Sequence, residues 1–161
     1  MPRKSISKKN NIPLPLYRKI VASIPICCVD AVFWAGNKVY LFKRAYEPAK
    51  SKWWLIGGRI IKGERLRDAV LRKVKEEICV DARILKIVGT YELFFRNGRF
   101  DGDFNKKGTH AISICYVVKP KRNDFRLKLN EEYSDYKAIT KIEKNLDPYV
   151  KRVLEDSGML G

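Results

Sequence analysis

Two adjacent carboxylates, Glu76 and Glu77, stand near the end of a stretch whose apolar residues recur every three or four positions. Such a period is typical of one face of a helix. A glycine pair, Gly57 and Gly58, comes before this stretch and directly after an apolar run. Carboxylate oxygens are the ligands that hard divalent cations such as Mg²⁺ prefer. A strand, a glycine turn and a helix that ends in adjacent acids therefore predict a place to hold a metal-bound phosphate.

A simpler interpretation treats these acids as the solvent-facing side of a helix. Arg72 and Lys73 stand four residues before Glu76 and Glu77, and pairs at this spacing support a helix without any further role. The spacing of the whole stretch favours the functional interpretation. It runs Gly58, five residues, Glu64, seven residues, Arg72, then Val74, Glu76 and Glu77.

This pattern resembles the Nudix box, which carries a glycine, a glutamate, an Arg-Glu pair, a Glu pair and a second glycine at fixed steps. Seven constrained positions match over 23 residues: Gly58, Glu64, Arg72, Val74, Glu76, Glu77 and Val80. Two positions depart, because Lys73 replaces a glutamate and Cys79 replaces the glycine that ends the helix. Since Lys73 removes one carboxylate and adds an ammonium group, we expect the number of bound ions to fall to one.

Over most of residues 14 to 157 the sequence resembles one branch of this family, the GDP-mannose mannosyl hydrolases. That branch also lacks the glutamate at the position of Lys73. The resemblance rests on Asp30, Lys43-Arg44, Trp53-Trp54, Gly57-Gly58-Arg59, Thr109-His110 and the run from Glu131 to Tyr136.

The resemblance implies a Mg²⁺-dependent hydrolase, with Mn²⁺ as an alternative ion. The implied substrate is a nucleoside diphosphate linked to another group, above all a nucleotide sugar such as GDP-mannose. The implied metal ligands are the Gly57 carbonyl, Glu76, Glu77 and Glu132. Arg44 and Arg59 would neutralise the diphosphate, Arg72 would assist or brace the acids, and Asp30 would contact the substrate or an active-site arginine.

The identity of the general base stays open. The branch has a histidine where this chain has Tyr133, and a phenol with a pKa of about 10 is a poor base at neutral pH. A second histidine expected within residues 89–95 is missing, and Leu93 stands there. His110, the single histidine, is more typical of a strand start than of a base. Glu132 could act as the base, or water could attack phosphorus, so attack at carbon and at phosphorus are both possible.

The order of elements predicts an α+β protein, a Nudix-type α/β/α sandwich with a mixed sheet. We expect a flexible basic N-terminus over residues 1–12 and a single domain over 13–161. The expected helices span residues 14–21, 66–78 and 146–154, and residues 96–103 form a surface loop. The expected strands span residues 26–34, 38–42, 53–56, 82–95 (as one strand or two), 109–118 and 133–139.

Composition limits the remaining classes. The chain has 161 residues, of which 45% are hydrophobic and 32% charged, as in a soluble globular domain. No apolar run approaches the about 20 residues that cross a bilayer, and the basic N-terminal residues lack the apolar segment that follows them in a signal peptide. We therefore expect a cytoplasmic protein with no membrane contact. The four cysteines form no CxxC or Cys/His cluster, which favours buried reduced thiols over zinc.

Three further expectations concern partners. The net charge of +16 allows weak non-specific nucleic-acid binding, and a nucleic-acid-binding or RNA-processing Nudix protein is one alternative function. A second alternative, motivated by Lys73 and Tyr133, is a catalytically degenerate module that binds nucleotides. The amphipathic segment at residues 14–21 could pack across a homodimer.

Overall fold

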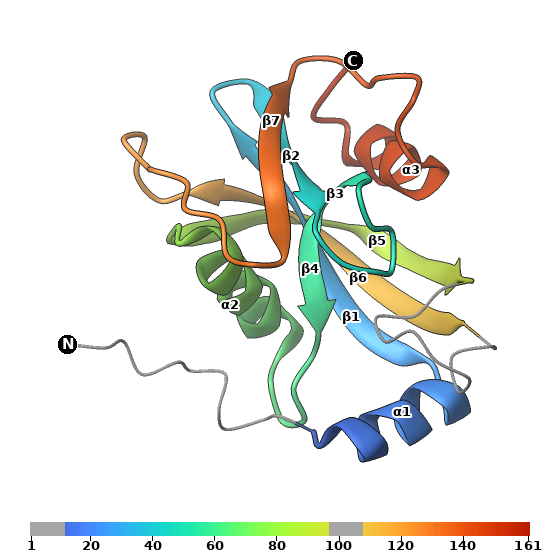
Figure 1. Cartoon of the computed structure of the whole chain (residues 1–161). Helices are drawn as coiled ribbons and strands as arrows, with labels where there is room; N and C mark the ends of the chain where they lie inside the picture. The colour runs from blue at the N-terminus through green and yellow to red at the C-terminus, as the bar shows by residue number, and fades with distance from the viewer. Residues whose placement is uncertain (1–11, 97–107) are drawn as a thin grey trace.

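A mixed β-sheet forms the centre of the computed structural model, which describes residues 12–96 and 108–161. Within these residues seven strands pair in one sheet (Figure 1). They are β1 (Ile26–Ala35), β2 (Lys38–Arg44), β3 (Trp53–Trp54), β4 (Ile56–Arg59), β5 (Ala82–Phe95), β6 (Thr109–Pro120) and β7 (Tyr133–Ile139). The order is β3-β2-β1-β6-β5, with β4 on β1 and β7 on β2. β1 pairs with β6 in parallel and with β2 and β4 antiparallel, so the predicted mixed sheet is confirmed.

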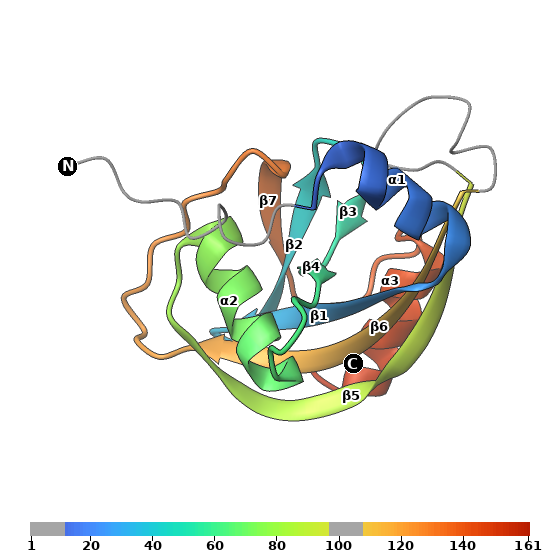
Figure 2. The ribbon, with the colours of Figure 1, turned by 90° about the horizontal axis from the view of Figure 1, so that it is seen from below.

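Helices cover both faces of this sheet. α2 (Leu66–Ile78) packs on one face, against β1, β4 and β5, and α3 (Pro148–Ser157) packs on the opposite face (Figures 1 and 2). Val70 and Val74 of α2 are completely buried, as are Val153 and Leu154 of α3. Both helices thus turn an apolar stripe toward the sheet. The predicted α/β/α sandwich is confirmed.

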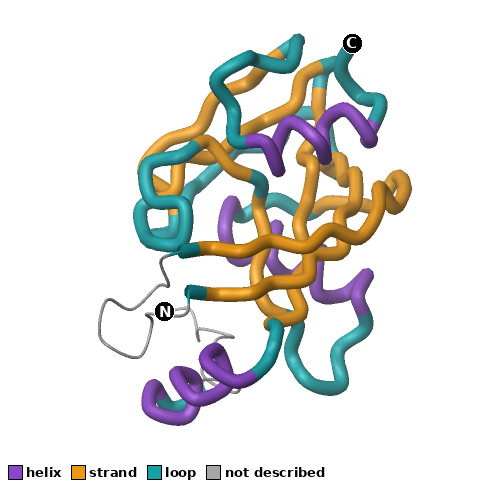
Figure 3. The backbone as a smooth tube through the Cα atoms, turned by 90° about the vertical axis from the view of Figure 1, so that its right-hand side faces the viewer, coloured by secondary structure: helices purple, strands orange, loops and turns teal. Residues whose placement is uncertain are grey.

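The third helix has a different setting. α1 (Leu14–Ser23) lies at the edge of the sandwich, beside the end of the β5–β6 hairpin (Figures 2 and 3). As the structure describes it, α1 buries none of its residues completely, and its Leu14 and Leu16 are exposed. None of the described helices is long and apolar enough to cross a membrane.

The glycine pair lies inside a strand and not in a turn, which corrects the prediction. The strand expected at residues 53–56 is divided at Leu55, because the chain changes partner there: β3 pairs with β2, and β4 pairs with β1. Gly57 therefore stands opposite Asp30. A Cβ atom on Gly57 would lie 1.8 Å from Asp30 Oδ1, so no larger residue fits beside that carboxylate.

Other predictions have mixed outcomes. Residues 82–95 form one strand whose register shifts twice against β6, and α3 begins at Pro148 with Asp147 as its N-cap. The N-terminal residues 1–11 and most of the loop at 96–103 lie outside the described residues. All four cysteines are free thiols. Cys115 is buried, Cys28 and Cys79 are half-buried and Cys27 is exposed, so the prediction of buried thiols is confirmed for Cys115 alone.

Candidate active site

An open cavity of about 1010 Å³ lies between α1, α2 and the strands β1 and β4. Acidic and basic side chains that are distant in the sequence line it together. From the predicted set it gathers Asp30, Arg44, Gly57, Arg59, Glu76, Glu77 and Glu132. Arg72 and Tyr133 contact two of these acids from outside the lining. The predicted site residues therefore form one cluster.

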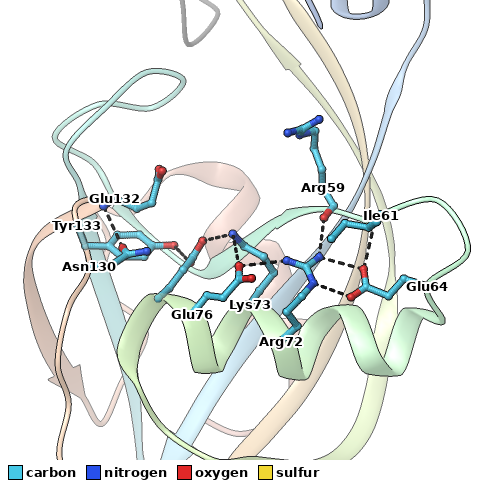
Figure 4. A network of polar contacts seen from close by, with 10 residues as sticks. Arg59, Ile61, Glu64, Arg72, Lys73, Glu76, Asn130, Glu132 and Tyr133 are labelled. Atoms are coloured by element: carbon cyan, nitrogen blue, oxygen red, sulfur yellow. Dashed lines mark hydrogen bonds and ion pairs between the residues drawn. The ribbon is translucent and has the colours of Figure 1, made fainter. Parts of the chain in front are cut away.

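Arg72 connects α2 to the loop that precedes it (Figure 4). Its Nε donates to Glu64 Oε1 at 2.6 Å and its Nη2 to Glu64 Oε2 at 2.9 Å, a bidentate pair. Nη1 donates to Glu76 Oε2 at 3.1 Å, and Nη2 also reaches the Arg59 carbonyl at 3.1 Å. Glu64 Oε2 accepts from the Ile61 amide as well. The hydrogen bond from Arg72 lowers the pKa of Glu64, so this carboxylate stays ionised in a fixed position.

Glu77 lies in a second network, so the simpler interpretation that it faces solvent does not hold for this residue. Its side chain is 2% exposed, and its two oxygens have different partners. Lys73 Nζ lies 2.6 Å from Glu77 Oε1 and 3.8 Å from Glu76 Oε2. The Tyr133 hydroxyl donates to Glu77 Oε2 at 2.6 Å. Lys73 and Tyr133 thus contact the same carboxylate. These are the two departures from the resemblance that bear on chemistry.

Burial controls the protonation of this second network. Burial raises the pKa of Glu77, and the Lys73 ammonium opposes that rise. Burial also raises the pKa of Tyr133 well above its usual value, and the charge of Glu77 adds to the shift. Tyr133 therefore keeps its proton and serves as a donor to Glu77. This geometry agrees with the expectation that it is a poor base.

Asp30 is held by two residues that the sequence pattern did not identify. Ser113 Oγ donates to Asp30 Oδ2 at 2.6 Å, and the Tyr149 hydroxyl donates to the same oxygen. Burial raises the pKa of Asp30, and these hydrogen bonds oppose the rise. We expected an arginine or the substrate to balance this buried acid. Arg44 donates its Nε to the Pro48 carbonyl, and its charge, like that of Lys73, also opposes the rise in the pKa of Asp30. No local sequence motif predicts the contacts of Ser113 and Tyr149 with Asp30. The pairing of β1 with β6 and the packing of α3 against the sheet bring these residues to Asp30.

Two further placements concern the rim of the cavity. The Arg59 guanidinium lies 4.4 Å from the ring centroid of Tyr17 in α1, a cation–π contact that sequence reasoning also missed. His110 Nε2 lies 3.2 Å from Glu92 Oε1, and its ring stacks on exposed Phe94. Its neighbours Thr109 and Ala111 line the cavity, whereas His110 does not. His110 is therefore not placed to act as a base there.

The donor groups suit a hard cation in their chemistry. Glu76, Glu77 and Glu132 supply carboxylates to one cavity. The negative charge of Glu132 adds to the rise in the pKa of Glu77. Across residues 12–96 and 108–161, however, no three acidic, histidine or cysteine side chains converge as a ready metal site. The cation that contacts Glu77 is the ammonium of Lys73.

A comparison with protein families decides the relationship of the chain. The family model for the NUDIX domain matches residues 27–155, most of the chain. The chain belongs to the Nudix family. The resemblance in the sequence pattern is therefore confirmed, and with it the general class of Nudix hydrolase.

Individual relatives agree with this assignment. The Nudix chain is 33% identical over 144 residues to the low-salt glycan biosynthesis protein Agl8 of Haloferax volcanii, with 89% of each protein covered. It is 31% identical over 94 residues to an ADP-ribose pyrophosphatase of Methanocaldococcus jannaschii, covering 58% of this chain and 50% of that protein. A MutT Nudix hydrolase of Burkholderia pseudomallei superimposes with a TM-score of 0.66 at 17% identity, covering 83% of this chain and 98% of the other, which supports the fold.

The two networks can now be described in terms of the Nudix box. Positions that match the box, Glu64, Arg72 and Glu76, build the network that ties α2 to its preceding loop. Glu77 is held by Lys73, which departs from the box, and by Tyr133, which lies outside the box. The departures therefore alter the surroundings of one box carboxylate and leave the bracing of the helix in place.

Proposed function

We propose that this Nudix protein hydrolyses a nucleoside diphosphate linked to a second group, with a nucleotide sugar such as GDP-mannose as the substrate class. One divalent ion, Mg²⁺ or Mn²⁺, takes part. The observation that carries the proposal is that Arg44 and Arg59 line the same cavity as the carboxylates of Glu76, Glu77 and Glu132. The likeness to a protein described by its role in glycan biosynthesis supports a sugar as the second group.

Each residue then has a separate task. Arg44 and Arg59 bind the diphosphate, because guanidinium groups match phosphate oxygens in charge and geometry. Gly57, Glu76 and Glu77 hold the ion, and the task of Glu132 is proton transfer. When bound, the ion neutralises the charge that develops on the phosphate oxygens. The residues named in this paragraph as binding or holding are those that touch the diphosphate or the ion.

The remaining residues position these groups or handle protons. Arg72 keeps Glu76 in place, and Tyr133 donates to Glu77 and does not act as the base. Glu132, which is half-buried at the cavity wall, accepts the proton of the attacking water. Asp30, fixed by Ser113 and Tyr149, offers its carboxylate to a hydroxyl of the second group.

A turnover screen tests the function. GDP-mannose, ADP-ribose and a dinucleotide are each incubated with Mg²⁺, with Mn²⁺ or with EDTA, and the products are separated by ion-exchange chromatography. We expect hydrolysis of the nucleotide sugar that EDTA abolishes. Absence of turnover with every compound would instead support a nucleotide-binding module without activity. Hydrolysis in ¹⁸O-labelled water then assigns the attacked atom, because the label enters the sugar after attack at carbon and the phosphate after attack at phosphorus.

A carboxylate variant tests the role of Glu77. Glu77→Gln keeps the shape of the side chain and removes its charge, so we expect kcat/KM to fall about 100-fold, the scale on which weakened metal sites lose activity. Glu155→Gln is the matched control, because Glu155 is exposed on α3, which packs on the sheet face opposite α2. Hydrolysis that survives Glu77→Gln unchanged would overturn the assignment of this residue to the ion.

A further inference from the structure

Lys73 occupies a space that Gly58 leaves open. A Cβ atom on Gly58 would lie 2.8 Å from Lys73 Cε and 3.2 Å from its Nζ. The lysine side chain is 17% exposed, lies beside Gly58 of β4 and lines the cavity. Figure 4 shows it beside Glu76 on α2. Its ammonium therefore reaches Glu77 from the cavity side and is not a surface charge.

The ammonium and a divalent ion need the same oxygen. Glu77 Oε2 accepts from Tyr133, and Oε1 is the oxygen that Lys73 contacts. The nearby Glu76 is 3.8 Å from Lys73 and is already engaged by Arg72. An ion that enters through Oε1 would lie against the ammonium, and two cations at that distance repel each other. Lys73 must therefore leave Glu77 when an ion binds there.

We propose that Lys73 is an exchangeable cation that holds Glu77 in the metal-free protein and moves to the phosphate oxygens of the substrate when a divalent ion takes Glu77. This proposal rests on the proposed function, because it needs an ion and a diphosphate in the cavity. A released ammonium requires a new anionic partner, and a diphosphate between Arg44 and Arg59 supplies one. Binding of the ion and of the diphosphate is then positively coupled.

The first test measures ion binding without any substrate. Mn²⁺ is titrated into the full-length protein at pH 8 and followed by electron paramagnetic resonance, which gives the number of ions and their Kd. Lys73→Met removes the competing charge and keeps the length of the chain, so we expect Mn²⁺ to bind at least about tenfold more tightly, as for removal of a strong local charge. Lys75→Met is the matched control, because Lys75 is half-exposed, pairs with Asp81 and does not line the cavity. We expect its Kd to stay within about twofold of the wild-type value.

The second test measures the coupling. GDP is titrated calorimetrically into each protein at saturating Mg²⁺. If Lys73 moves to the phosphates, Lys73→Met binds GDP about tenfold more weakly, the loss of one charge-assisted contact, whereas Lys75→Met does not. Lys73→Gln, with a polar end that can still donate to Glu77, repeats both measurements if Lys73→Met does not fold.

Three results would overturn the proposal. Lys73→Met could bind Mn²⁺ no more tightly than Lys75→Met, which would show that the ammonium does not compete. It could bind Mn²⁺ more tightly but GDP equally well, which would show that the ammonium does not move to phosphate. Lys73→Gln could behave as the wild type in both. Because the Mn²⁺ titration uses no turnover, failure of the hydrolysis screen and failure of the exchange are separate outcomes.

Discussion

Arg72 and Lys73 are adjacent on one helix, but they make different contacts, which indicates different roles. Arg72 distributes its donors over Glu64, Glu76 and the backbone carbonyl of Arg59. Lys73 directs one ammonium to carboxylates in the cavity. The network of Arg72 joins α2 to the loop that precedes it, through the Glu64 side chain and the Arg59 carbonyl. The contact of Lys73 with Glu77 joins two side chains that line the cavity.

The difference follows from the two cations. A guanidinium is planar and presents its donors in a fixed fork, so it is suited to a permanent bidentate pair. An ammonium is a point charge on a flexible chain, so it can change partners at small cost. We infer that Arg72 is a fixed brace and Lys73 a movable charge. The following experiments aim to separate them, in order of decreasing expected effect.

Arg72→Met should cause the largest loss of stability. It leaves Glu64 and Glu76, whose side chains are 14% and 28% exposed, without their shared cation. Breaking a buried pair costs about 3–5 kcal/mol, and with this partial exposure we expect about 3 kcal/mol from the free energy of unfolding. Urea unfolding with and without saturating Mn²⁺ measures the effect.

The ion provides the contrast with Lys73. We expect Mn²⁺ to restore only part of the stability that Arg72→Met loses, because the ion can replace the missing charge beside Glu76 but not beside Glu64. In Lys73→Met the ion replaces the missing charge beside Glu77, so Mn²⁺ should restore most of the stability lost. Equal rescue of both variants would contradict the distinction between brace and movable charge.

The Arg72 network could be anticipated from the sequence, because its members are related by fixed spacing within one segment. Gly58, Glu64, Arg72 and Glu76 all belong to the Nudix box, and the order of strands and helices gave the sandwich. The division of the strand at Leu55 was missed, since it depends on which neighbour each half of an apolar run pairs with.

The environment of Glu77 could not be anticipated in the same way. Lys73 and Tyr133 are 60 positions apart in the sequence, and each appeared as a separate departure. Lys73 and Tyr133 contact opposite oxygens of Glu77 because the segment that leads into β7 lies against the end of α2, where the Asn130 amide donates to the Glu77 carbonyl. Ser113 and Tyr149 were missed for the same reason. Packing between segments distant in the sequence brings their hydroxyls to Asp30, and no local sequence pattern indicates it.

Tyr133→Phe should have an intermediate effect. It removes the hydroxyl that donates to Glu77 and keeps the ring that packs 5.5 Å from Phe42. A buried acceptor left without its donor costs about 1–3 kcal/mol, so we expect a loss of about 2 kcal/mol. Tyr136→Phe, at an exposed position of the same strand, is the control and should change stability little. Thermal or urea unfolding of both variants checks this.

The same variant also tests whether Tyr133 is a base. If the phenol only positions Glu77, Tyr133→Phe should change the level of kcat/KM without removing a step in its pH profile. Loss of the basic limb of that profile would show that the phenol itself exchanges a proton during the reaction.

Cys79→Gly should give the smallest effect, and in the opposite direction. Cys79 ends α2 in the left-handed conformation, with φ of 58° and its amide bonded to the Lys75 carbonyl. A residue with a Cβ atom is strained there by about 1–2 kcal/mol, and the entropy that glycine loses on folding offsets part of the gain. We expect a net stabilisation of about 0.5–1 kcal/mol in urea unfolding.

Cys79, the second departure from the box, completes the contrast because it touches neither acid network. Cys79→Gly should raise stability while leaving the Kd of Mn²⁺ and its stoichiometry unchanged, whereas Lys73→Met should shift the Kd. A change in Mn²⁺ binding on Cys79→Gly would mean that the end of α2, and not the ammonium of Lys73 alone, controls how Glu77 meets a cation.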